Sequence, residues 1–248
     1  MKILVFGAGV LGCNLARNFF RAGKDVTLLA RGAWGESIPK NGLRIKDKFS
    51  PRMSVSRIPV TAELKAEDKY DVIFVVLRYT QLDAILDTLR MNPTKNIVFV
   101  GNDVRASALS ASLPEKNVMF AFASSAGHRE REYVASVDLK KLKGNTAYLN
   151  RLIDANIEGY RAIKNAGHEI LPKDDAEFEG AAYRKTCLRF FKLMSATSLG
   201  KICASDHAMN ATDEMNALNR DLKAFFDENG AKYPVWQELE QEVAKYLK

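Results

Sequence analysis

Short apolar runs alternate with helically spaced apolar residues over most of the first two thirds of the chain. The runs are rich in Val, Ile, Leu and Phe, and the clearest of them is apolar on both faces, as an interior strand of a parallel sheet must be. We expect strands at 2–6, 25–30, 71–77, 97–100 and 118–123. Helical spacing between them, at about 10–21 and 82–89, predicts an α/β, doubly wound parallel sheet with ligands at the carboxyl ends of its strands.

Two stretches of the chain depart from this alternation. Residues 32–39 contain Gly, Trp and Pro, and we expect a loop there. Residues 53–56 alternate apolar and polar side chains, which predicts one side of a small antiparallel excursion. Later in the chain, a helix is expected at 152–167, followed by a short strand at 168–171.

The last part of the chain has helical periodicity alone. Apolar residues repeat at spacings of three and four in three stretches, 176–196, 215–230 and 235–247. Pro172 is followed by two aspartates, which favours a domain boundary because aspartate caps a following helix well. We therefore expect a Rossmann-type domain at 1–172 and a smaller all-helical domain at 173–248.

A glycine motif joins the first expected strand to the first expected helix. Its residues are Gly7, Ala8, Gly9, Val10, Leu11 and Gly12. In a dinucleotide-binding turn, the first glycine permits a sharp turn, the second lets the backbone approach a pyrophosphate, and the third lets helix and strand pack closely. The strand before it and the helix after it favour this interpretation over the alternative, a glycine turn that holds no ligand.

The residue after the second strand indicates the kind of dinucleotide. An NAD-dependent protein offers a carboxylate to the ribose 2′-hydroxyl at this point, whereas this chain has Arg31. A guanidinium favours a 2′-phosphate, so we expect NADP(H); the alternative is an ordinary surface arginine. Other polar residues also fall just past the ends of expected strands: Arg78, Gln81, Asn102 and Ser124.

The composition of the chain argues against several other classes of function. The 248 residues carry a formal net charge of +7 with a pI near 9.2, but the basic residues are spread along the chain. This spread argues against a nucleic-acid binder and fits the attraction of a small anionic substrate. No apolar run is long enough to span a membrane, and no signal peptide is recognisable, so we expect a cytoplasmic protein.

Neither the cysteines nor the histidines form a metal-binding pattern. The cysteines are odd in number and widely separated, and we expect buried, unreactive thiols in a reducing compartment: Cys13, Cys187 and Cys203. The histidines have no partner at ligand spacing: His128, His168 and His207. No metal is therefore expected.

The helix expected at 176–196 has a core face and a basic stripe. The core face holds Tyr183, Cys187, Phe190, Phe191 and Met194. Lys185, Arg189 and Lys192 lie nearly opposite, but they share their side with apolar residues such as Leu188. Such a helix is either wedged between two bodies, with Lys185 pointing into a cleft, or it carries an ordinary solvated stripe.

These motifs together resemble the ketopantoate reductases (2-dehydropantoate 2-reductases), NADPH-dependent enzymes with a Rossmann domain followed by a helical domain. The resemblance rests on five segments that span most of the chain: Lys2-Ile3 with Gly7-x-Gly9-x-x-Gly12, Leu29-Ala30-Arg31, Val76-Leu77-Arg78-Tyr79-Thr80-Gln81, Gly101-Asn102 and Tyr183-Arg184-Lys185. It implies the NADPH-dependent reduction of a small 2-oxo acid or a related ketone.

The resemblance also implies roles for single residues. The cofactor would be held by the glycine turn, Arg31, Leu77 and Arg78, with Gln81 and Asn102 at its nicotinamide end. In the helical domain, a lysine would be catalytic and would stabilise or protonate the developing alkoxide, and this lysine is Lys185. An arginine, either Arg78 or Arg189, would pair with a substrate carboxylate.

The chain departs from the family pattern around the expected substrate site. Arg78 replaces a usual lysine, and Arg189 and Leu193 replace two asparagines. The family's substrate-binding serine and glutamate lie further along a longer helical domain, so we expect a divergent, C-terminally short member. These departures keep a second function open, an NADP-binding regulatory or sensor protein without catalysis. A homodimer formed through the helical domain would let a second subunit complete the site.

Overall fold

The computed structural model describes residues 1–47, 52–123, 140–197, 200 and 211–244. The chain divides into two compact units, Met1–Tyr133 and Val134–Lys248. This division differs from the boundary expected at residue 172, because the helix at 146–165 packs on the helices that follow it.

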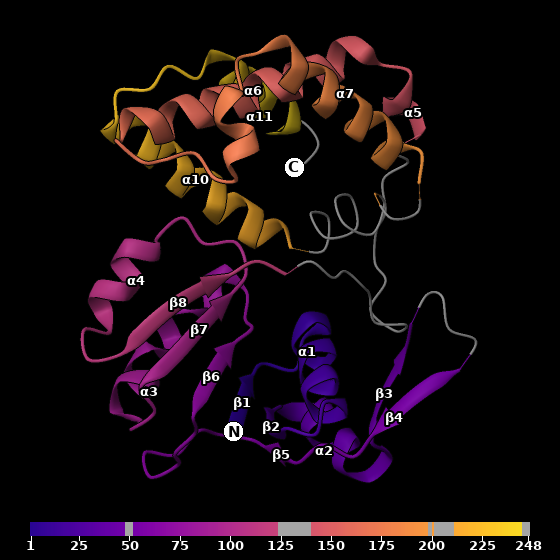
Figure 1. Cartoon of the computed structure of the whole chain (residues 1–248), viewed down its shortest axis with the longest axis vertical. Helices are drawn as coiled ribbons and strands as arrows, with labels where there is room; N and C mark the ends of the chain where they lie inside the picture. Colours follow the sequence, from indigo (N-terminus) through magenta and orange to yellow (C-terminus); the bar gives the residue numbers. More distant parts are fainter. Residues whose placement is uncertain (48–51, 124–139, 198–199, 201–210, 245–248) are drawn as a thin grey trace. The chain divides into compact units, whose positions relative to one another are not determined.

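The first unit is a parallel sheet with helices on both faces (Figure 1). Its elements are β1 (Lys2–Phe6), α1 (Val10–Arg21), β2 (Asp25–Leu29), α2 (Gly32–Asn41), β5 (Val60–Thr61), β6 (Val72–Val75), η1 (Tyr79–Gln81), η2 (Asp83–Ile85), α3 (Leu86–Met91), β7 (Asn96–Val100), α4 (Ala106–Ser112) and β8 (Asn117–Ala121). The six strands lie in the order β5-β2-β1-β6-β7-β8, and all neighbours are parallel. The predicted α/β doubly wound fold is confirmed, and the strand order reverses between β1 and β6, where such sheets bind ligands.

Successive residues of the central strands serve two different cores. In β1, Leu4 and Phe6 face a core that α3 and α4 cover, whereas Ile3 and Val5 face a core that α1 and α2 cover. All four side chains are at most 3% exposed. Because neighbouring residues of a strand point to opposite faces, a strand buried on both sides must be apolar throughout, as the sequence pattern indicated.

A small antiparallel hairpin, β3 (Leu43–Lys46) and β4 (Met53–Ser56), projects from this unit, as predicted. It is tied to α1 by Arg17, which is 5% exposed. One guanidinium nitrogen of Arg17 donates to both carboxylate oxygens of Asp47, at 2.7 and 2.8 Å, and another donates to Asn14 at 2.6 Å. A buried arginine needs such partners, so the hairpin and the helix form one body.

Two local predictions were wrong. Residues 32–39 are not a loop but belong to α2; burial of Ile38, which is 2% exposed, holds a helix that its glycines and Pro39 disfavour. Residues 168–171 form no strand. Ile170 is buried among helices there, so the apolar pattern reflects helix packing and not strand pairing.

The second unit is helical throughout the part that the structure describes. Its elements are α5 (Lys140–Lys143), α6 (Thr146–Asn165), η3 (Lys173–Glu177), α7 (Ala181–Ser195), α10 (Thr212–Glu228) and α11 (Pro234–Ala244). The long helix α6 contacts α5, α7, α10 and α11. In the middle of α6, Ile153 and Ile157 are buried in a cluster with Phe178. Further along the same helix, Ala162 packs with Phe226.

The helices predicted for the end of the chain are confirmed with shifted limits. Those expected at 215–230 and 235–247 correspond to α10 and α11. The helix expected from residue 176 begins at Ala181, because 173–177 form a separate 3-10 turn. None of the described helices is both long and apolar enough to cross a bilayer.

A buried carboxylate joins α6 to α11. Glu158 is 5% exposed, and its two oxygens accept hydrogen bonds from the backbone N–H groups of Val235 and Trp236, at 3.0 and 2.9 Å. These N–H groups lie in the first turn of α11, where a helix supplies no internal partner. The negative charge also lies at the positive end of the helix dipole, so Glu158 stabilises α11 in two ways.

Replacing Glu158 by Ala should destabilise the chain by about 2 kcal/mol, because it leaves two helix N–H groups without their acceptors. Urea unfolding followed by far-UV circular dichroism measures the loss. Glu179→Ala is the control: Glu179 forms an exposed pair with Arg161, so its removal should cost less than about 1 kcal/mol. Equal losses in the two variants would contradict the role given to Glu158.

Candidate functional site

The glycine turn after β1 packs tightly against the end of β6. Gly7 has a φ of +121°, and a Cβ there would lie 2.3 Å from the carbonyl oxygen of Val76. A Cβ on Gly12 would lie 1.9 Å from the carbonyl oxygen of Gly7. Both positions require glycine, which agrees with the sharp turn and the close packing expected from the sequence.

The middle glycine of the turn has a different environment. Gly9 is the N-cap of α1, and a Cβ there would have no atom within 4 Å among the described residues. The N–H of Cys13 donates the first bond of the helix to the Gly9 carbonyl at 2.9 Å, so the N–H groups of Val10, Leu11 and Gly12 precede the helical hydrogen bonds. No side chain caps α1, and its first turn has no acidic residue. This helix N-terminus is suited to an anion.

Arg31 lies at the end of β2, the strand beside β1. The N–H of Gly7 donates to the carbonyl of Leu29 at 3.3 Å, which ties the glycine turn to this strand end. Arg31 is exposed and is the N-cap of α2. A Cβ on Gly35 would lie 2.6 Å from the Ala30 carbonyl oxygen, so α2 begins close against the strand. A guanidinium and a second helix N-terminus therefore occur together.

The segment after β6 forms the 3-10 turn η1. The N–H of Gln81 donates to the Arg78 carbonyl at 2.9 Å, and the Gln81 side-chain oxygen accepts from the Arg78 N–H at 3.2 Å. Gln81 therefore caps its own turn, which the sequence did not reveal. Arg78 and Gln81 are exposed, and Leu77 is half-buried against the glycine turn.

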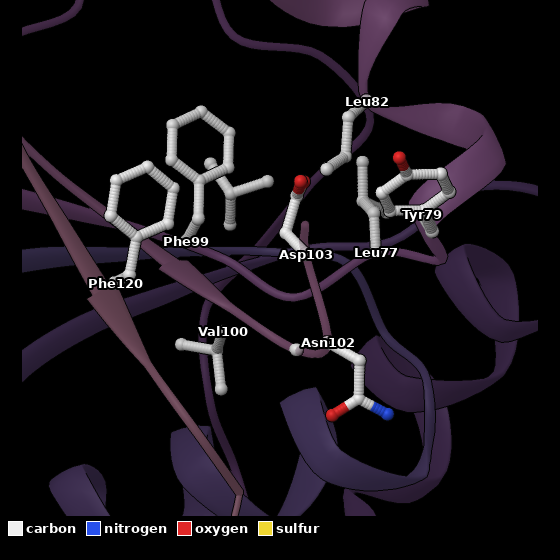
Figure 2. Close-up of a pocket in the computed structure, with 10 residues that line it drawn as sticks. Leu77, Tyr79, Leu82, Phe99, Val100, Asn102, Asp103 and Phe120 are labelled. Atoms are coloured by element: carbon white, nitrogen blue, oxygen red, sulfur yellow. The ribbon is translucent and has the colours of Figure 1, made fainter. Parts of the chain in front are cut away.

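The loop after β7 directs two neighbouring side chains to opposite sides. Figure 2 shows the Asp103 carboxylate directed into a shallow hollow near Phe99 and Leu82, and the Asn102 amide directed away from it. The hollow has room for about one water molecule. It is a packed junction between two loops, and the exposed Asn102 is the residue of this pair that a ligand can reach.

Sequence reasoning missed the residue that joins these loops, Arg105. Its guanidinium donates to both carboxylate oxygens of Asp83, at 3.2 and 3.0 Å, and lies 4.3 Å from the centre of the Tyr79 ring. Its backbone N–H donates to the Asp103 carboxylate at 2.6 Å. Burial alone would lower the pKa of Arg105, but the hydrogen bond to Asp83 and the nearby negative charges raise it above its ordinary value. The sequence held one weak signal, Asp and Arg two residues apart after a strand.

In the second unit, α7 carries Lys185 and Arg189 as exposed side chains. Its other face packs on α6, where the Asn156 amide donates to the Tyr183 hydroxyl at 2.8 Å. Burial, followed by interactions with Cys187 and Tyr160, raises the pKa of Tyr183 far above its ordinary value, so this hydroxyl stays protonated. The catalytic role of Lys185 stays a prediction.

The core face predicted for α7 is only partly confirmed. Tyr183, Cys187 and Phe191 are half-buried against α6, but Phe190 is 54% exposed. Of the thiols expected to be buried, the one at Cys13 is buried and the one at Cys187 is half-buried. Four residues discussed from the sequence lie outside the described residues: Ser124, His128, Cys203 and His207. Within the described ranges, no group of three or more metal-ligating side chains occurs.

Comparisons with known proteins extend this description. The family model described as "Ketopantoate reductase PanE/ApbA" matches residues 3–144, which is more than half of the chain. A 2-dehydropantoate 2-reductase of Mesorhizobium japonicum is 38% identical over 92 residues, which cover 36% of this chain and 27% of that protein. A 2-dehydropantoate 2-reductase of Lactococcus lactis is 24% identical over 146 residues, 48% of this chain and 46% of that protein. The chain thus spans less than half the length of either relative.

A solved structure gives a match over nearly the full length. D-mandelate dehydrogenase, in a ternary structure with NADH and anilino(oxo)acetate, has a TM-score of 0.66 and covers 99% of this chain and 97% of its own. The two sequences are 14% identical. At that identity the similarity shows the fold alone.

Replacing Gly12 by Ala should destabilise the chain by about 2 kcal/mol or more, because the added Cβ meets a backbone carbonyl that cannot move aside. Gly9→Ala is the matched variant, and it should cost less than about 1 kcal/mol because its Cβ points into open space. Chemical denaturation of the two variants measures the difference. Equal stability would show that the turn is not packed as described.

Proposed function

The chain belongs to the ketopantoate reductase PanE/ApbA family, and from this premise we propose that it is an oxidoreductase that uses NADPH to reduce the carbonyl group of a small 2-oxo acid. One observation carries the proposal, the turn after β1. Neighbouring backbone leaves no room for a Cβ at Gly7 or Gly12. A Cβ at Gly9 would meet no described atom within 4 Å, and Gly9 lies at a helix N-terminus that no side chain caps. A pyrophosphate needs this close approach to backbone N–H groups.

The residues present fit a phosphorylated dinucleotide. The N–H groups at the start of α1 would hold the pyrophosphate, and Arg31 with the N-terminus of α2 would hold the 2′-phosphate. The nicotinamide end would then lie towards the strands on the other side of the switch point. There the proposal places Leu77, Arg78, Gln81 and Asn102.

Arg31 is the argument for NADPH rather than NADH. Its planar guanidinium can pair with a phosphate through two parallel hydrogen bonds. A protein of this fold that prefers NAD has a carboxylate near the end of β2, and the first turn of α2 contains no acidic residue. The solved D-mandelate dehydrogenase holds NADH, so the cofactor preference needs its own test.

The reduction of a carbonyl group also requires a proton for its oxygen. NADPH, when bound, supplies a hydride to the carbonyl carbon, and the oxygen then requires a proton. We assign the proton to Lys185, whose ammonium would stabilise the negative charge on the oxygen and donate one proton to it. Arg78 and Arg189 are both exposed, and one of these two arginines would pair with the substrate carboxylate. The product of this step is a 2-hydroxy acid.

A second function is supported by a residue of α7 that departs from the expected family pattern. The resemblance described from the sequence implies an asparagine at the position of Leu193, which is 63% exposed and offers no polar group. An NADP-binding regulatory protein that has lost catalysis would tolerate such a change. Binding of NADPH without oxidation by any 2-oxo acid would decide for this function. The homodimer through the second unit stays a prediction.

Replacing Arg31 by Ala should weaken the binding of 2′,5′-ADP roughly tenfold or more, because a charge-assisted contact to the 2′-phosphate is lost. Binding of 5′-ADP should change little, since it lacks that phosphate. Isothermal titration calorimetry measures both affinities. Arg21→Ala, at the far end of α1, is the control and should leave both unchanged. If the unaltered chain binds the two nucleotides equally well, the preference for NADPH is wrong.

Replacing Lys185 by Met should lower the rate of NADPH oxidation with an active 2-oxo acid by roughly two to four orders of magnitude, as for other general acids. NADPH affinity should stay within about twofold, since Lys185 is assigned to the substrate carbonyl and not to the phosphates. Absorbance at the nicotinamide band follows turnover over a panel of 2-oxo acids. Lys164→Met, at the exposed end of α6, is the control. Weakened NADPH binding with normal turnover would refute the assignment.

A further inference from the structure

The turns that follow β6 hold the Arg105 side chain on several sides. The guanidinium pairs with both oxygens of Asp83, covers the ring of Tyr79 and approaches the Tyr79 carbonyl oxygen at 3.5 Å. The Arg105 side chain is 27% exposed and Tyr79 is 3% exposed. A flat, forked cation can satisfy a carboxylate and an aromatic face together, whereas the compact ammonium of lysine cannot do both.

The backbone of the same residue fixes the loop after β7. The Arg105 N–H donates to the Asp103 carboxylate at 2.6 Å, which folds the loop back on itself just before α4. Asn102 immediately precedes Asp103 and points the opposite way (Figure 2). The direction of the Asn102 amide therefore depends on how firmly Asp103 is held.

We propose that Arg105 is a positioning residue that fastens the loop after β7 to the turns after β6, so that Asn102 and Gln81 meet the nicotinamide end of the cofactor at a fixed spacing. The proposal rests on the function proposed above, because that function places Asn102 and Gln81 beside the nicotinamide. Arg105 acts through the two loops and touches neither cofactor nor substrate.

The physical reason is preorganisation. Loops at the carboxyl ends of strands are the mobile parts of such a fold, and ordering them at the moment of binding costs affinity. A contact that already fixes both loops removes that cost for the part of the ligand they touch. It leaves the pyrophosphate and 2′-phosphate contacts, which belong to α1 and Arg31, unaffected.

The test compares two ligands that differ in the nicotinamide end. NADPH occupies the whole proposed site, whereas 2′,5′-ADP reaches only its phosphate end. In Arg105→Met, NADPH affinity should fall roughly tenfold and 2′,5′-ADP affinity should stay within about twofold. Arg105→Lys should lie between the unaltered chain and Arg105→Met, because it keeps the charge and loses the fork. Calorimetric titration gives each affinity.

Arg90→Met is the matched control. Arg90 also pairs with a nearby carboxylate, that of Asp87, and also donates to a backbone carbonyl, that of Ser112, at 3.2 Å. It lies in the last turn of α3 and not at the strand ends that form the proposed site. The same substitution there should leave both affinities within about twofold.

A second measurement tests the fastening without any ligand. Amide hydrogen exchange in the free protein should accelerate at 79–85 and 101–105 in Arg105→Met and remain unchanged in the α1 turn. If Arg105→Met does not fold, Asp83→Asn replaces it, because that variant weakens the same pair and keeps the arginine.

The outcomes separate the two proposals. An equal loss of affinity for both ligands in Arg105→Met, or no loss for either, overturns the role of Arg105 while the proposed function stands. Unchanged exchange in both loops overturns it as well. If the unaltered chain binds neither ligand, the proposed function fails and the role of Arg105 fails with it.

Discussion

The arrangement of the first unit depends on backbone packed directly on backbone. Gly12 lies so close to the carbonyl oxygen of Gly7 that no side chain fits between them, and Gly7 in turn lies against the carbonyl oxygen of Val76. This packing places the N-terminus of α1 at the end of β1, where the strand order reverses. A helix held any further from the strand would carry its N–H groups away from the sheet edge at which the other strands end. The suitability of the turn for an anion is therefore a consequence of steric fit before it is one of charge.

Much of the fold follows from local pattern, and the exceptions have tertiary causes. Strands buried on both faces are apolar throughout, so β1, β6 and β7 stand out in the sequence. The helix α2 does not, because two glycines and Pro39 lower its propensity, and the burial of Ile38 against the sheet offsets them. The segment at 168–171 gave the opposite error, since an apolar residue that packs among helices resembles a short strand. The domain boundary was expected at residue 172 because the sequence of α6 does not reveal which elements this helix packs on.

The candidate site divides in the same way. The glycines could be recognised from the sequence because their spacing is set by one turn and the start of one helix. Arg31 could be recognised because it directly follows a strand. Arg105 gave almost no signal, since its partners at Tyr79 and Asp83 come from a different loop and meet it only in the folded chain. Gln81 was expected at the ligand and is found to cap its own turn with one end of its amide. The role of Lys185 remains a prediction, because it concerns chemistry and not packing.

Asn102 and Asp103 are adjacent in sequence, yet one faces outward and the other inward. The inward side chain is held by the Arg105 N–H two residues later, so the spacing between Asp103 and Arg105 matters for the loop. Evolution can therefore vary the outward residue and alter what the protein recognises without disturbing the interior. An insertion between Asp103 and Arg105 would instead separate the carboxylate from the backbone N–H that donates to it. The inward contact therefore depends on the length of this segment more than on the identity of its outward residue.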